Sequence, residues 1–365
     1  MMPVSCGLPA RIRFVKQRRL AVSHQLLSFF LFLVPIFLVP IYAFSQQQQF
    51  AALGDFKLDS GEVLRNCRIG YRTFGQLNAE KSNLILIPTW AGGTTREWMS
   101  NVGPGKLADS SKYFVVLVDA LSNGVSSSPS NSTAQPHMHF PHITIRDMVN
   151  TQHEMLIKFF HIEHIKAVMG ISMGGMQTFQ WMVSYPEFMD DAVPIVGSPR
   201  LAAFDLLHWK MQIDVIENDP AWKGGDYKRN PAREAEYEFG SILLTTPEHF
   251  NATTSREEVL KKIEEARRGQ EGSDANDKIR QSEAMMALDV SSGFGGSMEA
   301  AAAAVKAKVL VIVAKYDHTV TPGPALEFAR LLHAGVLELA GDCGHEAAGC
   351  EGDKVRPAVS EFLGK

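Results

Sequence analysis

Short apolar runs recur along this chain, and segments with the apolar spacing of helices separate them. Most of the runs are continuous rather than alternating, which is typical of strands that are buried on both faces of a parallel sheet. The pattern therefore predicts an α/β protein in which helices flank a mostly parallel central sheet. The predicted strands are 84–87, 113–118, 165–169, 192–196, 309–313 and 336–339, preceded by an antiparallel pair at 53–58 and 64–74, and the predicted helices are 148–160, 323–332 and 355–363.

One long region departs from this alternation. Residues 201–297 contain many charges and no strand pattern, and their apolar spacing is helical. A helical insertion between two strands of such a sheet is expected to form a lid over the carboxyl ends of the strands, where these folds place their sites. We therefore expect a core of residues 46–200 and 298–365 with an inserted lid of residues 201–297. The helical pieces of the lid are predicted at 204–217, 232–244, 256–269 and 275–288.

Residues 1–45 have the organisation of a secretory signal peptide. Five basic residues, the last of them Arg19, precede an apolar block at 26–43, and the small residues Ala43 and Ser45 stand where cleavage is expected. An uncleaved membrane anchor is the alternative, because the block is near the lower limit of about 18 residues for a membrane span. Two prolines in the block and the cleavage site favour removal. We therefore expect an exported protein, periplasmic or secreted, that is attached to a membrane only if this segment is retained.

Composition narrows the classes of function. The chain has 365 residues, of which 45% are hydrophobic and 21% charged, so it has ample material for one large core. The formal net charge is −4, and loss of the five basic residues of the leader would make it −9, so no nucleic-acid partner is expected.

Cys343 and Cys350 lie seven residues apart in one predicted loop. An oxidising compartment would permit a disulfide between them, and two free thiols are the alternative. No second Cys/His pair at ligand spacing accompanies them, so we expect no metal site. We also expect no cofactor.

The strongest chemical signal is the G-x-S-x-G pattern centred on Ser172, which follows a predicted strand and leads into a helical segment. This is the pattern of a nucleophile elbow, in which a strained turn holds up the serine hydroxyl and the flanking glycines avoid the clash of a Cβ. An ordinary hydroxyl in a glycine-rich turn is the alternative, and the strand-to-helix context argues against it. Ser172 is therefore the candidate nucleophile.

A serine hydroxyl is a weak nucleophile unless a base takes its proton and a third group orients that base. Asp317 follows the next-to-last predicted strand, and His345 follows the last one. Serine, then acid, then histidine is the order in which α/β-hydrolases supply these groups. We expect His345 to be the base and Asp317 to orient it, with His318 and Asp342 as the competing neighbours.

The oxyanion that develops during acyl transfer needs N–H donors that are already in place. The backbone N–H of Met173, directly after the nucleophile, is one expected donor. The other is expected from the loop after the strand at 84–87, where the backbone N–H of Trp90 is the candidate. Gly92 and Gly93 in this loop would let the backbone approach the substrate, or else merely turn the chain.

Four segments together resemble the homoserine O-acetyltransferase family of α/β-hydrolases. They are GISMGGMQ at 170–177, IGYRTFGQLN at 69–78, FPHITIRDMV at 140–149 and NDPAWKGGDY at 218–227. The resemblance extends from about residue 61 to the C-terminus and is looser in the lid. It implies an α/β-hydrolase fold, a triad of Ser172, Asp317 and His345, acyl transfer through an acyl-serine intermediate, and a homodimer formed through the lid helices.

Three departures from the family pattern concern the substrate. The family places an arginine in the first lid helix to hold a carboxylate, whereas Lys210 is the only cation near that place, and lysine does not replace a bidentate arginine. Glu346 stands where the family has an aspartate that meets the substrate's amino group. The loop at 88–92 reads PTWAG where the family has a loop of the His-Ala-Leu-Thr-Gly type, so the indole of Trp90 is expected beside the site. Lys210, Glu346, Gly92 and Gly93 are the candidate substrate contacts.

Export bears on the choice of acyl acceptor, because acetyl-CoA is a cytoplasmic metabolite. With water as the acceptor, the same triad gives an esterase. The leading hypothesis is therefore an exported serine hydrolase acting on small-molecule carboxylic esters. The alternative is an O-acyltransferase that uses acyl-CoA. A non-catalytic binding protein on a hydrolase scaffold is the least favoured, because all three triad positions are filled.

Overall fold

The structure, a computed structural model, describes residues 47–365 except 232 and 269–273. The leader at 1–45 lies outside the described residues, so its cleavage and the export of the chain stay predictions. Within the described part, no helix is both long and apolar enough to cross a membrane.

An eight-stranded sheet forms the centre of the fold, in the order β1-β2-β4-β3-β5-β6-β7-β8. β2 is antiparallel to both β1 and β4, and the remaining neighbours are parallel. This arrangement confirms the mostly parallel sheet and its antiparallel opening pair. The strands are β1 (Gln49–Lys57), β2 (Val63–Phe74), β3 (Leu84–Pro88), β4 (Phe114–Val118), β5 (Ile165–Ile171), β6 (Met189–Ile195), β7 (Lys308–Ala314) and β8 (Gly335–Leu339).

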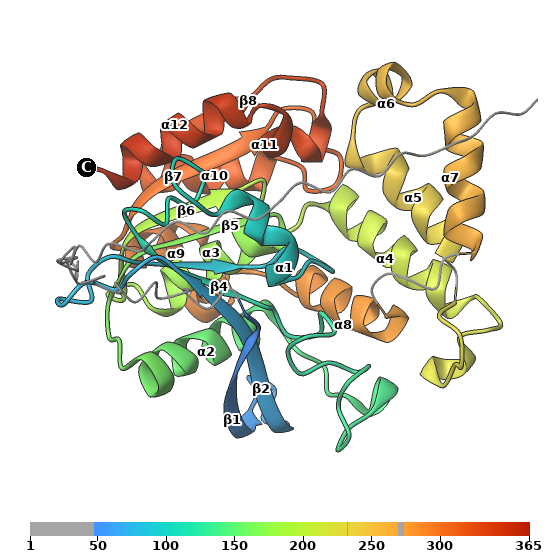
Figure 1. Ribbon diagram of the computed structural model, residues 1–365, viewed down its shortest axis with the longest axis horizontal. Coiled ribbons are helices and arrows are strands. Elements are labelled where there is room, and N and C mark those ends of the chain that lie inside the picture. The colour runs from blue at the N-terminus through green and yellow to red at the C-terminus, as the bar shows by residue number, and fades with distance from the viewer. Residues whose placement is uncertain (1–46, 232, 269–273) are drawn as a thin grey trace, which may run out of the picture. The chain divides into compact units, whose positions relative to one another are not determined.

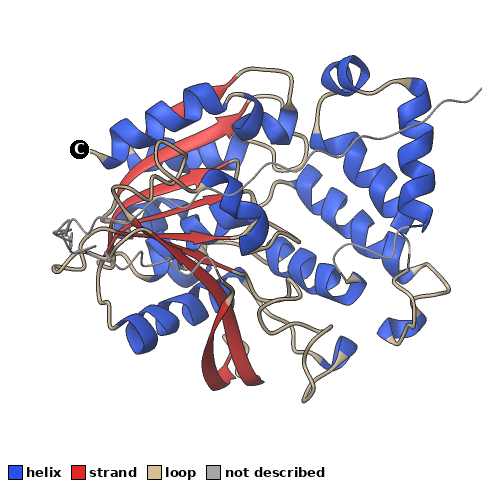
Figure 2. Cartoon of the chain, viewed as in Figure 1, coloured by secondary structure: helices blue, strands red, loops and turns tan. Residues whose placement is uncertain are grey.

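Helices cover both faces of this sheet, as Figures 1 and 2 show. On one face α2, α3, α9 and α10 pack on a large apolar core, and on the other α1 and α12 enclose a second one. Side chains of β3 alternate between the two cores and are all fully buried, which is why the strand is continuously apolar. The core helices are α1 (Thr95–Trp98), α2 (Ile145–Met155), α3 (Met173–Ser184), α9 (Met298–Ala304), α10 (Gly323–Leu332), α11 (Ala347–Cys350) and α12 (Gly352–Leu363).

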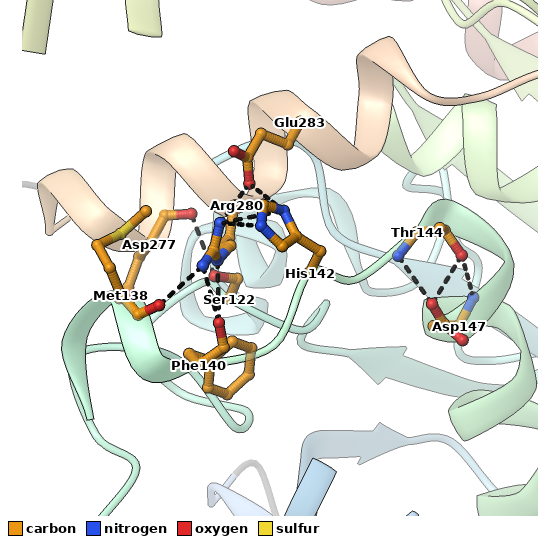
Figure 3. Close-up of polar contacts among 9 residues, drawn as sticks. All are labelled: Ser122, Met138, Phe140, His142, Thr144, Asp147, Asp277, Arg280 and Glu283. Carbon is orange, nitrogen blue, oxygen red and sulfur yellow. Dashed lines mark hydrogen bonds and ion pairs between the residues drawn. The ribbon is translucent and has the colours of Figure 1, made fainter. Parts of the chain in front are cut away.

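Helix α2 begins earlier than its apolar spacing predicts. Thr144 and Asp147 form a capping box, in which each side chain accepts a hydrogen bond from the backbone N–H of the other residue (Figure 3). The helix therefore starts at Ile145, and the last part of the predicted segment, 156–160, is a single π-helical turn.

In the described part of the predicted insertion, five helices lie between β6 and α9. In Figure 1, α4 and α8 lie nearer the sheet than the group α5, α6 and α7 does. The short α6 is not predicted by apolar spacing, because its start is set by the Thr246 side-chain cap and a proline in its first turn. The lid helices are α4 (Ala203–Glu217), α5 (Arg233–Leu244), α6 (Pro247–Thr253), α7 (Arg256–Arg268) and α8 (Ala275–Met286).

Candidate active site

Ser172 occupies the turn between β5 and α3, with φ 58° and ψ −122°. A non-glycine residue in this region of positive φ is strained, and the turn is held by the Ser172 N–H, which donates to the carbonyl of Ile195 at 2.9 Å. Space around the turn is small. A Cβ on Gly170 would lie 2.3 Å from the backbone of Gly174, and one on Gly174 would lie 2.5 Å from the Pro88 carbonyl oxygen. Both flanking glycines are thus required by close packing.

The structure brings the two later residues to this serine. His345 Nε2 lies 2.8 Å from Ser172 Oγ, and His345 Nδ1 lies 2.6 Å from Asp317 Oδ2. A carboxylate only accepts, so Nδ1 carries the proton and Nε2 accepts from the hydroxyl. The other carboxylate oxygen, Oδ1, accepts the backbone N–H groups of Thr319 at 2.8 Å and Val320 at 2.9 Å. The serine hydroxyl therefore faces a base whose orientation is fixed.

Burial and charge act in opposite directions on the pKa of His345. The exposed fractions of Ser172, Asp317 and His345 are 7%, 2% and 9%. Burial lowers the pKa of His345, but the charge and hydrogen bond of Asp317 outweigh it, so the net pKa lies above that of an ordinary histidine. The two neighbouring candidates are placed differently: His318 is exposed, and Asp342 pairs with His249 at 3.1 Å.

A cavity of about 430 Å³ opens at Ser172. Core and lid both contribute to its lining, and Trp209 and Leu244 come from lid helices α4 and α5. Its ionisable side chains, among the described residues, are limited to His345 and Glu346. A small and largely apolar cavity of this kind suits an uncharged organic substrate. The lining residues are Trp90, Ala91, Asn101, Leu107, Ile171, Ser172, Trp209, Leu244, Thr319, His345, Glu346, Ala348 and Gly349.

Three of the four predicted substrate contacts do not line this cavity within the described chain, and each has another structural role. Lys210 is half-exposed and pairs with Asp214 one turn further along α4. Gly92 has φ 68°, and its N–H donates to Gln281. A Cβ on Gly93 would lie 2.2 Å from the indole nitrogen of Trp90. Both glycines therefore shape the loop.

Met173 directly follows the nucleophile in the chain, and Trp90 lines the same cavity as Ser172. Met173 is the first residue of α3, so its N–H has no acceptor within the helix. In the loop after β3, the N–H groups of Thr89, Gly92 and Gly93 have acceptors, while those of Trp90 and Ala91 have none among the described residues. The side chain of Trp90 lines the cavity and packs on Trp98 with ring centroids 5.6 Å apart.

The loop that carries the base is cross-linked. Cys343 and Cys350 form a disulfide, which decides between the two alternatives that the sequence left open. His345 lies inside the closed loop, and α11 follows it. His249 of the lid also approaches Cys343 Sγ, at 3.4 Å from Nδ1, but disulfide sulfurs are not the thiolates that metals bind.

Several residues of the site carry no motif. Trp209 and Leu244 are lid residues in a region with only helical spacing, so nothing in the sequence indicates which of its apolar side chains face the nucleophile. Gln281 contacts Gly92 from 189 residues away. Such a contact depends on how α8 docks, which local pattern does not specify. By contrast, Asp214 four residues after Lys210 is a readable signal that this lysine has a partner on its own helix.

Comparisons with known proteins agree with this geometry. Residues 83–348 match the model of the alpha/beta hydrolase fold family. The ethyl acetate hydrolase of Pseudomonas veronii is 33% identical over 77% of this chain and 83% of its own length. A homoserine O-acetyltransferase of Pelobacter propionicus is 30% identical over 87% of this chain and 96% of its own.

Solved structures extend the same result. The acetyl esterase MekB superposes with a TM-score of 0.83 at 28% identity, covering 87% of this chain and 97% of that one. The homoserine O-acetyltransferase of Bacillus anthracis gives 0.80 at 27% identity, covering 87% and 98%. The relatives are thus both esterases and acyltransferases, and ester hydrolysis or acyl transfer is the enzymatic activity of this group. The chain belongs to the α/β-hydrolases, in the homoserine O-acetyltransferase-like group that includes these esterases.

Proposed function

We propose that this enzyme is an exported serine hydrolase that cleaves small carboxylic esters, acetate esters among them, through an acyl intermediate on Ser172. The observation that carries the proposal is the continuous hydrogen-bonded chain from Ser172 Oγ through His345 to Asp317, at the floor of an apolar cavity. Each member has the partner that its role in acyl transfer requires.

In the proposed mechanism, His345 Nε2 takes the proton of Ser172 as Oγ forms a bond to the ester carbonyl carbon. The carbonyl electron pair moves onto oxygen, where the N–H groups of Met173 and Trp90 stabilise it. Collapse of this intermediate breaks the bond to the alcohol, which leaves with the proton from His345. Water then attacks the acyl-serine by the same steps and releases the acid, while Asp317 stabilises the imidazolium in both halves.

The cavity favours a neutral ester over homoserine. Homoserine carries a carboxylate, and binding it in a buried site requires a cation or several N–H donors. The described lining contains no arginine or lysine, and the Lys210 ammonium pairs with Asp214 instead. Both the ethyl acetate hydrolase and the acetyl esterase among the relatives carry names that point to small acyl groups.

A direct test is hydrolysis of ethyl acetate and p-nitrophenyl acetate by the purified protein without residues 1–45. Ser172→Ala is expected to lower kcat by about 10⁴-fold or more, because no other group can form the acyl intermediate. Ser184→Ala, at the end of the same helix, is the matched control and should retain activity. Unchanged hydrolysis in Ser172→Ala would remove this serine from the mechanism.

The second candidate is an O-acyltransferase, which the homoserine O-acetyltransferase relatives favour. Formation of O-acetylhomoserine from acetyl-CoA and homoserine, faster than ester hydrolysis, would establish it. A periplasmic reporter fused after residue 60 tests export, since only a translocated fusion is active. The lid homodimer also stays a proposal. It is supported by exposed apolar side chains on three lid helices, and light scattering of the purified protein tests it; these side chains are Phe204, Leu207, Ile242 and Leu260.

A further inference from the structure

Gln281, in lid helix α8, links two loops of the core. Its Oε1 accepts the backbone N–H of Gly92 at 2.7 Å, and its Nε2 donates to the carbonyl of Leu121 at 2.9 Å. The side chain is only 1% exposed. One amide of the lid therefore satisfies a donor in the loop after β3 and an acceptor in the loop after β4.

The helix that carries this glutamine is itself attached to the core. Asp277, one turn earlier, accepts from Ser130 N at 2.9 Å and Ser130 Oγ at 2.6 Å, and its carbonyl accepts from Ser122 Oγ at 3.1 Å. Arg280 donates to the carbonyls of Met138 at 3.0 Å and Phe140 at 2.9 Å, as Figure 3 shows. These bonds hold α8 against the loop after β4, so Gln281 reaches Gly92 from a fixed position.

The loop that Gln281 holds is the one that carries Trp90. Gly92 adopts a positive φ, which lets its N–H turn towards the lid. The same loop is also held by Asn123, whose Nδ2 donates to the Gly93 carbonyl at 3.0 Å. Between Trp90 and Gly92 there is one residue, Ala91, and the direction of the Trp90 N–H depends on how these peptides are oriented. Without the Gln281 acceptor, the part-buried Gly92 N–H would lose its partner and the loop would gain freedom to rotate.

We propose that Gln281 is a positioning residue for the reaction: it fixes the loop after β3 so that the Trp90 N–H faces the oxyanion formed at Ser172. This inference rests on the proposed function. It makes the lid part of the catalytic apparatus, because the second oxyanion donor is in place only when α8 is docked. Gln281 itself touches no reacting atom.

The test compares Gln281→Met with Gln180→Met. Both substitutions replace a buried glutamine in a helix by an apolar side chain of similar length, but within the described chain the Gln180 side chain bonds only to Ser184, on the same helix. For p-nitrophenyl acetate, we expect kcat of Gln281→Met to fall about 10- to 100-fold with KM changed less than about 3-fold, because a displaced donor weakens transition-state binding alone. Gln180→Met should stay within about 3-fold of the parent.

An inhibitor separates positioning from loss of fold. A trifluoromethyl ketone forms a hemiketal with Ser172 whose oxygen occupies the oxyanion position, so its affinity should fall in Gln281→Met by the same factor as kcat/KM. The thermal midpoints of the two methionine variants should be similar, and the acidic limb of the pH profile, which reports on His345, should not move. Gln281→Glu keeps an acceptor for Gly92 and should recover part of the lost kcat, which gives a second comparison if the methionine variant folds poorly.

Each outcome bears on the inference. Parental kcat in Gln281→Met, equal losses in Gln180→Met, or unchanged affinity for the ketone would overturn it while leaving the proposed function intact. A parent protein that hydrolyses no ester and forms no hemiketal would overturn the proposed function and this inference together.

Discussion

Replacing Asp317 by asparagine keeps the shape of the side chain but replaces one accepting carboxylate oxygen by an NH₂ group that donates. Thr319 and Val320 both donate backbone N–H groups to Oδ1, so the amide oxygen of the variant must stay on that side. Its NH₂ group then faces His345 Nδ1, which becomes an acceptor. The imidazole proton therefore moves to Nε2, where it points at the Ser172 hydroxyl and prevents the ring from taking the serine's proton.

The expected loss is large because the base is in the wrong tautomer in nearly every molecule. In the well-studied serine proteases the equivalent change lowers kcat about 10⁴-fold, or about 5 kcal/mol in the barrier, and we expect a similar factor for Asp317→Asn. Stability should change little, because the three hydrogen bonds to this side chain keep their geometry. The assay is kcat/KM for p-nitrophenyl acetate together with thermal unfolding.

Asp205→Asn is the matched control. Asp205 is also fully buried and accepts from Thr321 and from the Ala202 N–H, but it makes no hydrogen bond to the imidazole. We expect its variant to keep kcat/KM within about 3-fold. A folded Asp317→Asn protein with more than a tenth of the parental kcat would refute the tautomer argument, and with it the role of Asp317.

Three further predictions concern pH and the disulfide. Asp317 keeps the pKa of His345 above its ordinary value, and the base must be neutral, so kcat/KM should rise with pH through a midpoint above about 6.5; a midpoint below 6 would contradict this. Burial raises the pKa of the Asp277 carboxyl from 3.8 to about 7, so the folded state holds this proton more tightly than the unfolded state does. The free energy of unfolding should therefore fall by about 3 kcal/mol between pH 5 and pH 8. Asp277→Asn keeps the geometry of both serine contacts and should abolish this part of the pH dependence of stability, as measured by urea titrations. Removing the disulfide with Cys343→Ser and Cys350→Ser together should cost about 2 to 3 kcal/mol of stability, read from the shift in urea midpoint, and adding dithiothreitol should then have no further effect on the variant.

The inner strands of the sheet could be predicted from the sequence because they are buried on both faces. The side chains of β3 are all buried, as are those of β7 after the exposed Lys308, so each strand contains a continuous apolar run. The order of Ser172, Asp317 and His345 could be predicted for a related reason. Each follows the end of a parallel strand, and parallel strands bring their carboxyl ends to one edge.

Four of the five described lid helices could be predicted, but their contacts could not. The short lid helix α6 and the alanine-rich core helix α9 are not indicated by apolar spacing. The sequence predicts Lys210 at the substrate because it is a cation in the first lid helix. In the structure, Lys210 forms an ion pair with Asp214 on the same helix. The contact of Gln281 with Gly92 depends on the docking of two elements far apart in the chain, and a buried glutamine has no local signature.

The insertion point of the lid has a consequence for how such an enzyme can diversify. The nucleophile lies before the insertion and the acid and base lie after it, so exchanging residues 201–297 would reshape the cavity wall at Trp209 and Leu244 without altering the reacting groups. A graft from a relative could therefore redirect selectivity towards larger acyl chains or alcohols. The exchange would also require the incoming segment to bring its own acceptor for the Gly92 amide, which makes that amide one compatibility requirement between lid and core.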